Sequence, residues 1–133
     1  MIEAKEIRIG NLVKYLVHLP VGYNHPSMSV TEIIEVREDM VQTTNGSHKY
    51  REIGPITLTE EILIKSGGIK TSDNFITFTD TDTITPEVVI FIEEEHFYLS
   101  NNNGEKYSVP LQSVHQFQNL FFTLLGKEVK IKI

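Results

Sequence analysis

The sequence contains no cysteine among its 133 residues, and no apolar run approaches the length of a membrane-spanning helix. Without thiols, neither a disulfide framework nor a zinc site with thiolate ligands can form. A spanning helix needs about 20 consecutive apolar residues. The first six residues, MIEAKE, also lack the apolar segment of a signal peptide. We therefore expect a cytoplasmic protein that does not enter a membrane.

Positive charge is also scarce. The chain has 12 lysines and arginines against 18 aspartates and glutamates, which gives a formal net charge of −6. A chain of net negative charge weakly repels polyanions, so nucleic acid is disfavoured as a partner, although a local basic face can still bind it. Near the C-terminus, the alternation of Lys130 and Lys132 with apolar residues predicts a final strand over Glu128–Ile133.

Recognisable catalytic motifs are absent as well. The five histidines form no His-Glu-x-x-His pair, and there is neither a Gly-x-Ser-x-Gly motif nor a Walker lysine. Asp80 and Asp82 alternate without the other ligands of a calcium loop. The sequence therefore favours a protein with no enzymatic activity, no cofactor and no metal. A small metal-dependent hydrolase, with carboxylates assembled from distant loops, is left open.

The pattern of residues 1–58 is typical of short strands joined by tight turns. The apolar stretch over 7–17 is interrupted at Gly10-Asn11, which predicts a bend, and the prolines and glycine of 19–26 predict a loop. Further strands are expected at 29–36, 40–44 and 49–53. Asn45-Gly46 is the signature of a type I′ turn between the last two. We predict a small, curled, SH3-like β-barrel.

The pattern of residues 59–133 predicts a β-meander with one main helix. Thr59 is a suitable N-cap for a short helix, and Gly67-Gly68 predicts the end of that helix. These glycines do not indicate a phosphate-binding loop, because such a loop precedes a helix. Ser113 and Gln116 have the spacing of a capping box, and apolar residues recur at helical spacing after them. Strands are expected at 75–79, 87–93, 96–99 and 106–109. The predicted fold class is α+β, with both parts in one compact unit.

One face of the main helix is a candidate interaction site. Residues at i, i+3, i+4 and i+7 share a side of a helix. Here they are His115, Gln118, Asn119 and Phe122. A polar strip that holds one large apolar residue can dock a partner. The same strip can also be the second buried side of a helix between two subdomains, and the sequence leaves both readings open.

A second candidate site uses the barrel. Aromatic rings stack on bases, and basic side chains contact phosphates. Tyr15, Tyr23 or Tyr50 would serve if they shared one face. The accompanying basic residues are Lys14, Lys49 and Arg51. This pattern is the best sequence argument for a nucleic-acid-binding module.

Three regions of the chain resemble a known family. They are Arg8–Val13 (RIGNLV), Pro55–Leu63 (PITLTEEIL) and, at the end, Val114–Phe122 (VHQFQNLFF) with Gly126-Lys127-Glu128. In this order they resemble a family of small uncharacterised proteins encoded in prophages and mobile elements of Bacteroidetes. The resemblance extends over nearly the whole chain, and it departs from the family pattern at Gly68, where an aromatic residue is expected.

The resemblance implies a setting and not an activity. It implies a bacterial cytoplasmic protein from a gut-type organism or its phage. The recurring His-Gln-x-Gln-Asn motif singles out His115, Gln116, Gln118 and Asn119, either as partner-binding residues or as residues that satisfy buried backbone.

Together these observations favour a non-enzymatic protein-interaction module of phage or mobile-element origin. An unknown protein is the expected partner, and a homodimer is left open. The alternative is a nucleic-acid-binding module that uses the N-terminal barrel, and the third hypothesis is the metal-dependent hydrolase.

Overall fold

The computed structural model describes residues 2, 4–17, 27–79, 86–100 and 105–133. The chain forms two compact units. Unit 1 consists of Met1–Ile56 with Ser113–Asn119, and unit 2 consists of Thr57–Gln112 with Leu120–Ile133. The sequence pattern predicts one boundary, after residue 58. The structure divides the chain after Ile56, and two further times at the ends of Ser113–Asn119.

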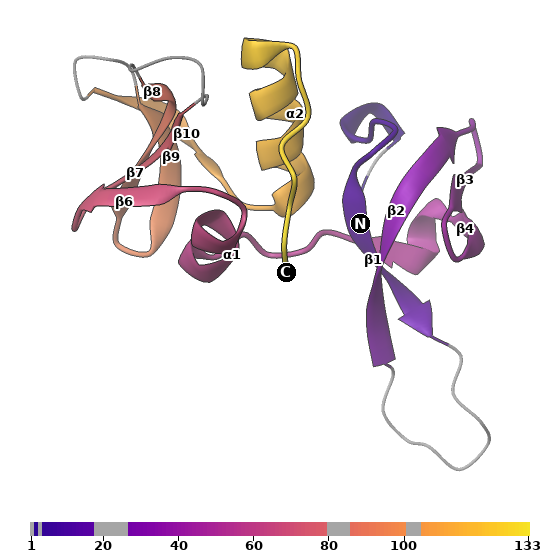
Figure 1. The fold of residues 1–133 in the computed structure, drawn as a ribbon. Coiled ribbons are helices and arrows are strands. Elements are labelled where there is room, and N and C mark those ends of the chain that lie inside the picture. Colours follow the sequence, from indigo (N-terminus) through magenta and orange to yellow (C-terminus); the bar gives the residue numbers. More distant parts are fainter. Residues whose placement is uncertain (1, 3, 18–26, 80–85, 101–104) are drawn as a thin grey trace. The chain divides into compact units, whose positions relative to one another are not determined.

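Unit 1 is built on a five-stranded antiparallel sheet (Figure 1). Its elements are η1 (Ala4–Glu6), β1 (Leu12–Val17), β2 (Ser27–Val36), β3 (Met40–Thr43), β4 (Gly46–Lys49), η2 (Tyr50–Glu52) and β5 (Ile53–Gly54). The strand order is β4-β3-β2-β1-β5, so β4 and β5 are the edges. Among the described residues these two edges do not pair, so no closed barrel is found in the region where the sequence predicts a small, curled, SH3-like β-barrel.

Alternation along β1 separates a buried side from an outer side. Val13 is fully buried and Tyr15 packs against the same core, so Leu12, Lys14 and Leu16 belong to the other face. The core of unit 1 consists of Ile2, Ile7, Val13, Ile33, Val41 and Ile53, with Tyr15, Val36 and Tyr50 packed against it. Burial of this apolar surface is the main stabilising term of the unit.

The bend predicted at Gly10-Asn11 is confirmed. Gly10 has a φ of 96°, which lies in the region that favours glycine. Asn11 is fully buried, and its Oδ1 accepts a hydrogen bond of 2.8 Å from the amide of Arg8. The amide of Gly10 donates to the carbonyl of Ile33 at 2.8 Å, which ties the bend to β2.

The turn between β3 and β4 lies one residue earlier than predicted. Thr43 pairs with Gly46, so the two loop residues are Thr44 and Asn45. A type I′ turn needs positive φ at both central positions. Neither Thr44 nor Asn45 has a positive φ, and the positive φ of 107° belongs to Gly46, which follows them. The hydroxyl of Thr43 holds the turn, because it accepts from the Asn45 amide at 3.1 Å and donates to the Gly46 carbonyl at 2.9 Å.

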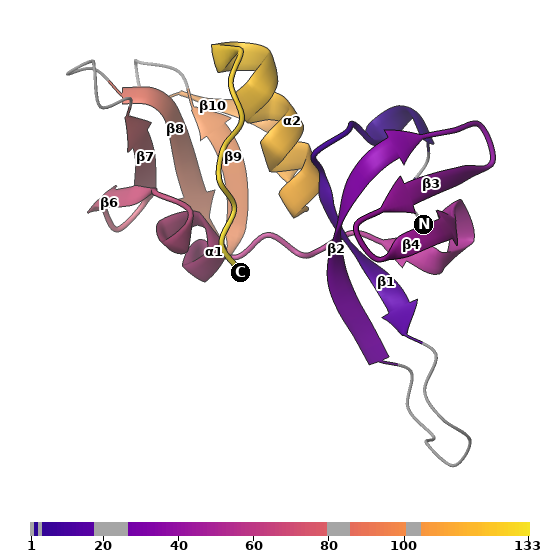
Figure 2. The same ribbon diagram turned by 45° about the vertical axis from the view of Figure 1, so that its right-hand side comes forward.

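Unit 2 carries a second five-stranded antiparallel sheet, a meander in the order β10-β9-β8-β7-β6 (Figure 2). Its elements are α1 (Glu60–Lys65), β6 (Ile69–Ser72), β7 (Phe75–Thr79), β8 (Pro86–Glu93), β9 (His96–Ser100), β10 (Lys106–Leu111) and the second half of α2 (Val114–Leu125). The α+β class is confirmed. The extra strand β6 has only exposed side chains, so no apolar alternation indicates it in the sequence.

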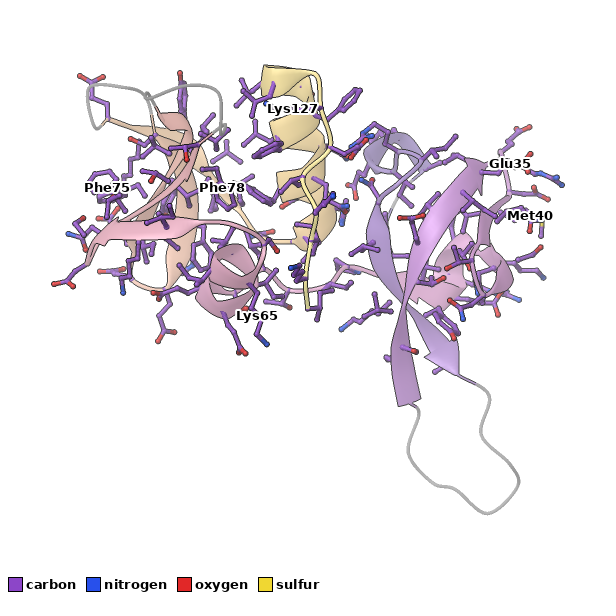
Figure 3. The ribbon with its side chains drawn as sticks, viewed as in Figure 1. Glu35, Met40, Lys65, Phe75, Phe78 and Lys127 are labelled. Carbon is purple, nitrogen blue, oxygen red and sulfur yellow. The ribbon has the colours of Figure 1, made fainter. Side chains whose placement is uncertain are left out.

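One face of the second sheet packs against helices. Phe78 of β7 meets Phe121 of α2 edge-on, with ring centroids 5.9 Å apart and an interplanar angle of 81°. The predicted N-cap of α1 is confirmed, since the Thr59 hydroxyl accepts from the Ile62 amide at 3.2 Å. Phe75, three residues before Phe78 on the same strand, lies on the opposite face of the sheet (Figure 3).

Close packing after α1 explains the glycine at position 68. A Cβ atom there would lie 2.6 Å from Cγ2 of Ile76, 2.8 Å from the carbonyl oxygen of Leu63 and 2.9 Å from the ring of Phe78. No side chain fits this space, so the aromatic residue that the family resemblance leads one to expect is excluded here.

The final segment, 126–133, is not the predicted strand. It has no regular secondary structure, and the amide of Lys132 donates to the hydroxyl of Ser66 at 3.0 Å instead of joining a sheet edge. Val129 is nevertheless buried. In this segment the apolar alternation thus buries Val129 without the backbone pairing of a strand. In the part of the chain that the structure describes, no helix combines the length and apolar character needed to cross a membrane.

Candidate functional site

The four residues of the predicted helix face do not form one exposed surface. His115 and Gln118 are only 2% and 3% exposed, whereas Phe122 is 38% exposed. Asn119 is half-buried. His115, Gln118 and Asn119 belong to unit 1. Phe122 belongs to unit 2.

Gln118 and Asn119 satisfy the backbone around the Gly10 bend. Gln118 Oε1 accepts from the amide of Leu12 at 2.8 Å, and its Nε2 donates to the carbonyl of Gly10 at 3.0 Å. Asn119 Nδ2 donates to the carbonyl of Glu6 at 2.9 Å. Its Oδ1 accepts from Asn11 Nδ2 at 2.8 Å. These bonds fit the second role that the His-Gln-x-Gln-Asn motif implies, satisfaction of buried backbone.

His115 is the buried titratable group of the same helix. Its Nδ1 lies 3.1 Å from the hydroxyl of Ser113, and its Nε2 has no hydrogen-bond partner among the described residues. Burial lowers the pKa of His115, and the carboxylate of Glu6, 3.9 Å from Nε2, opposes this effect only in part. The imidazole is therefore neutral at neutral pH.

Ser113, His115 and Glu6 together contain the three groups of a hydrolase triad, but their arrangement is that of a helix cap. Ser113 is only 3% exposed, and its hydroxyl accepts from the amide of Gln116 at 3.4 Å. Gln116 Oε1 accepts in return from the amide of Ser113 at 3.2 Å, which confirms the predicted capping box. A nucleophile must reach the substrate, and this hydroxyl is enclosed.

Among the residues that the structure describes, no three or more histidine, aspartate or glutamate side chains gather closely enough to hold a metal ion. Asp80 and Asp82, the acids of the predicted turn, lie outside the described residues.

The residues of the nucleic-acid hypothesis are not gathered on one face. Tyr15 packs inward, with its ring centroid 4.8 Å from that of His48, and Lys14 lies on the opposite side of β1. Tyr50 also packs against the core, and its hydroxyl donates to the carbonyl of Arg37. Lys49 and Arg51 are exposed beside it. Tyr23 lies outside the described residues.

The structure shows an apolar surface that the sequence reasoning missed, on the outer side of the β1–β2 hairpin. It consists of Leu16, Met28, Val30 and Ile34, which are 36%, 44%, 41% and 49% exposed. We call this set the outer hairpin face. Leu16 lies directly opposite Met28 in the β-ladder, and Lys14 lies opposite Val30. The exposed apolar side chains thus lie on both strands, with the charged Lys14 and Glu32 on the same face.

Both faces of this hairpin are apolar, which is unusual for an antiparallel sheet. Such sheets commonly pack one face on the core and leave a polar face in water. Here Val13 and Ile33 supply the core side. A signal was present in the sequence, because β2 has apolar residues at both even and odd positions.

Comparison of this chain with models of known families, with curated proteins and with solved structures finds no match in any of the three.

Proposed function

We propose that this protein is a non-enzymatic interaction module that docks a partner protein on the outer hairpin face. The observation that carries the proposal is a set of four large apolar side chains, on adjacent strands, that the core of unit 1 does not use. Contiguous exposed apolar patches mark interaction sites in folded proteins.

Covering these four side chains contributes part of the free energy of docking, and the remainder must come from contacts of the partner with neighbouring residues. Complete burial of a side chain of this type contributes about 1.5–3 kcal/mol. The four side chains retain between 36% and 49% exposure, so covering them contributes roughly 1 kcal/mol each. Lys14 lies opposite Val30, and Glu32 lies opposite Leu12, on this same face, so a partner must also match these two charges.

The proposal also extends to the fold of unit 1 and to the origin of the protein. An SH3-like reading of unit 1 is supported by the strand order β4-β3-β2-β1-β5 and by the 3-10 turn η2 just before β5. The family resemblance supports a cytoplasmic protein of phage or mobile-element origin, whose partner would be a bacterial or phage protein.

A matched pair of variants tests the docking surface. The double change Met28→Glu, Val30→Glu places two carboxylates on the outer hairpin face and leaves the core unchanged. Ser47→Glu, at an exposed position of β4, is the control. Each tagged protein captures partners from a nuclease-treated lysate of a Bacteroidetes host, and mass spectrometry identifies them.

We expect one specific protein with the wild type and with Ser47→Glu, and its loss with the double variant at an unchanged circular dichroism spectrum. A photo-crosslinking residue at position 30 should then attach to that protein. Capture that survives the double variant would refute the assigned surface. Capture that occurs only in a parallel lysate without nuclease would favour the nucleic-acid alternative, and a crosslink to a second copy would identify a homodimer.

A further inference from the structure

The face of the second sheet opposite the helices carries a row of aromatic rings. Phe75, Phe91 and Tyr98 stand on three neighbouring strands and lie directly opposite one another in the β-ladder. The rings of Phe75 and Phe91 are 5.2 Å apart between centroids and tilted by 59°. All three side chains are half-buried, so each ring keeps a surface open to solvent.

An ammonium group of the chain itself lies on this row. Nζ of Lys106, from the edge strand β10, is 4.6 Å from the centroid of Tyr98 and 5.9 Å from that of Phe91. The same Nζ forms an ion pair with the carboxylate of Glu93. A cation within about 6 Å of a ring face is attracted by the ring quadrupole. Two rings and one carboxylate thus form a cation-binding arrangement, which we call the aromatic cation site.

The hairpin end that carries Glu93 is acidic. Glu93, Glu94 and Glu95 follow one another at the end of the β8–β9 hairpin. Lys106 side-chain exposure is 40% and that of Glu93 is 44%, so the ion pair opens to solvent. An acidic border favours a cationic ligand and repels a polyanion.

We propose that Phe91, Tyr98 and Glu93 recognise a lysine side chain presented by an extended segment of a partner protein. Lys106 occupies the site in the free protein and leaves it when the partner binds. Phe75 continues the row by one strand spacing, about 4.8 Å, and offers apolar surface to a neighbouring residue of the same segment. This site lies in unit 2, so it stands whether or not the outer hairpin face binds a protein.

The simplest competing explanation is that Lys106 only covers apolar strand surface. The two explanations differ in the effect of removing its charge. If Lys106 competes with a ligand, Lys106→Gln opens the site and tightens binding. If Lys106 has a packing role alone, the substitution creates no affinity for an ammonium.

The probe is the peptide acetyl-Thr-Lys-Thr-Lys-Thr-amide, and the control peptide carries norleucine in place of both lysines. Binding is followed by NMR through the ring signals of Phe91 and Tyr98. The proteins are wild type, Lys106→Gln and Glu93→Gln. Lys70→Gln is the matched control. Lys70 of β6, on the same sheet but away from the aromatic row, also pairs with a half-exposed glutamate, Glu60 of α1.

We expect Lys106→Gln to bind the lysine peptide about two- to fivefold more tightly than wild type, the gain from removing an exposed cation–π contact. Lys70→Gln should bind like wild type, Glu93→Gln more weakly, and the norleucine peptide should leave the ring signals of Phe91 and Tyr98 unchanged. The proposal is overturned if Lys106→Gln binds the lysine peptide no better than wild type, or if the norleucine peptide binds as tightly as the lysine peptide. It is also overturned if neither wild type nor Lys106→Gln responds to millimolar lysine peptide.

Discussion

The β8–β9 turn should become more stable when its two glutamates are replaced by Asn-Gly. Glu94 and Glu95 form the two-residue loop, since Glu93 pairs with His96, and both have positive φ, of 49° and 65°. Positive φ at both positions is the requirement of a type I′ turn, whose preferred sequence is Asn-Gly. The present turn therefore holds two side chains in a backbone region that disfavours them.

The magnitude follows from the backbone terms. A non-glycine residue in the left-handed region is destabilised by roughly 1–2 kcal/mol. Glycine avoids this cost, but it adds about 0.5–1 kcal/mol of its own because the unfolded chain gains entropy. Glu95→Gly should thus stabilise by about 1 kcal/mol, and Glu94→Asn by roughly half as much because Asn tolerates this region. With an m-value of about 2 kcal/mol per molar urea, the midpoint should rise by about 0.7 M.

Urea titration followed by NMR signals of unit 2 measures this midpoint. The control Glu94→Gln, Glu95→Gln removes both charges and keeps the backbone conformation, so it separates charge repulsion from conformation. It should yield only a small part of the gain. A double variant Glu94→Asn, Glu95→Gly whose midpoint is equal to or below that of wild type would refute the reasoning.

Two further changes test unit 1. Gln118→Ala should destabilise it by about 2–4 kcal/mol, because the Gly10 carbonyl and the Leu12 amide both lose their partner; a urea midpoint equal to that of wild type would contradict this. Acidification from about pH 7.5 to about pH 5 should also destabilise unit 1 through His115. Since burial lowers the pKa of His115 in the folded state, the unfolded chain takes up the proton first, and stability is lost as the pH falls through the ordinary value of 6.5. His115→Gln should show a weaker pH dependence of the urea midpoint than wild type, and equal slopes would exclude His115 as the source.

Local features of the fold could be predicted from the sequence. The capping box of Ser113 and Gln116, the Thr59 cap and the bend at Gly10 each depend on a few adjacent residues. Their side-chain chemistry determines the backbone directly, so the spacing alone was sufficient.

Features that depend on distant pairing were missed or wrong. The alternation of Val129 and Ile131 predicted a strand, but a strand also requires a free sheet edge, and the amide of Lys132 binds Ser66 instead. Closure of the first sheet into a barrel also depends on distant pairing, because β4 would have to meet β5, and no such pairing exists among the described residues.

The candidate helix face was half predictable. Helical spacing correctly places His115, Gln118 and Asn119 on one side of α2. Spacing cannot show that residues more than 100 positions earlier bind Gln118 and Asn119, as the bond between Leu12 and Gln118 does across a separation of 106 residues.

The membership of Ser113–Asn119 in unit 1 has a consequence for the growing polypeptide. A ribosome releases the N-terminus first, so β1 to β5 emerge while the residues that complete their unit do not yet exist. Until Gln118 leaves the exit tunnel, the bend at Gly10 must be hydrated by water or held by other groups. The nascent chain can assemble the strands of its first sheet early, but it completes that unit only after Ser113–Asn119 has been made and released.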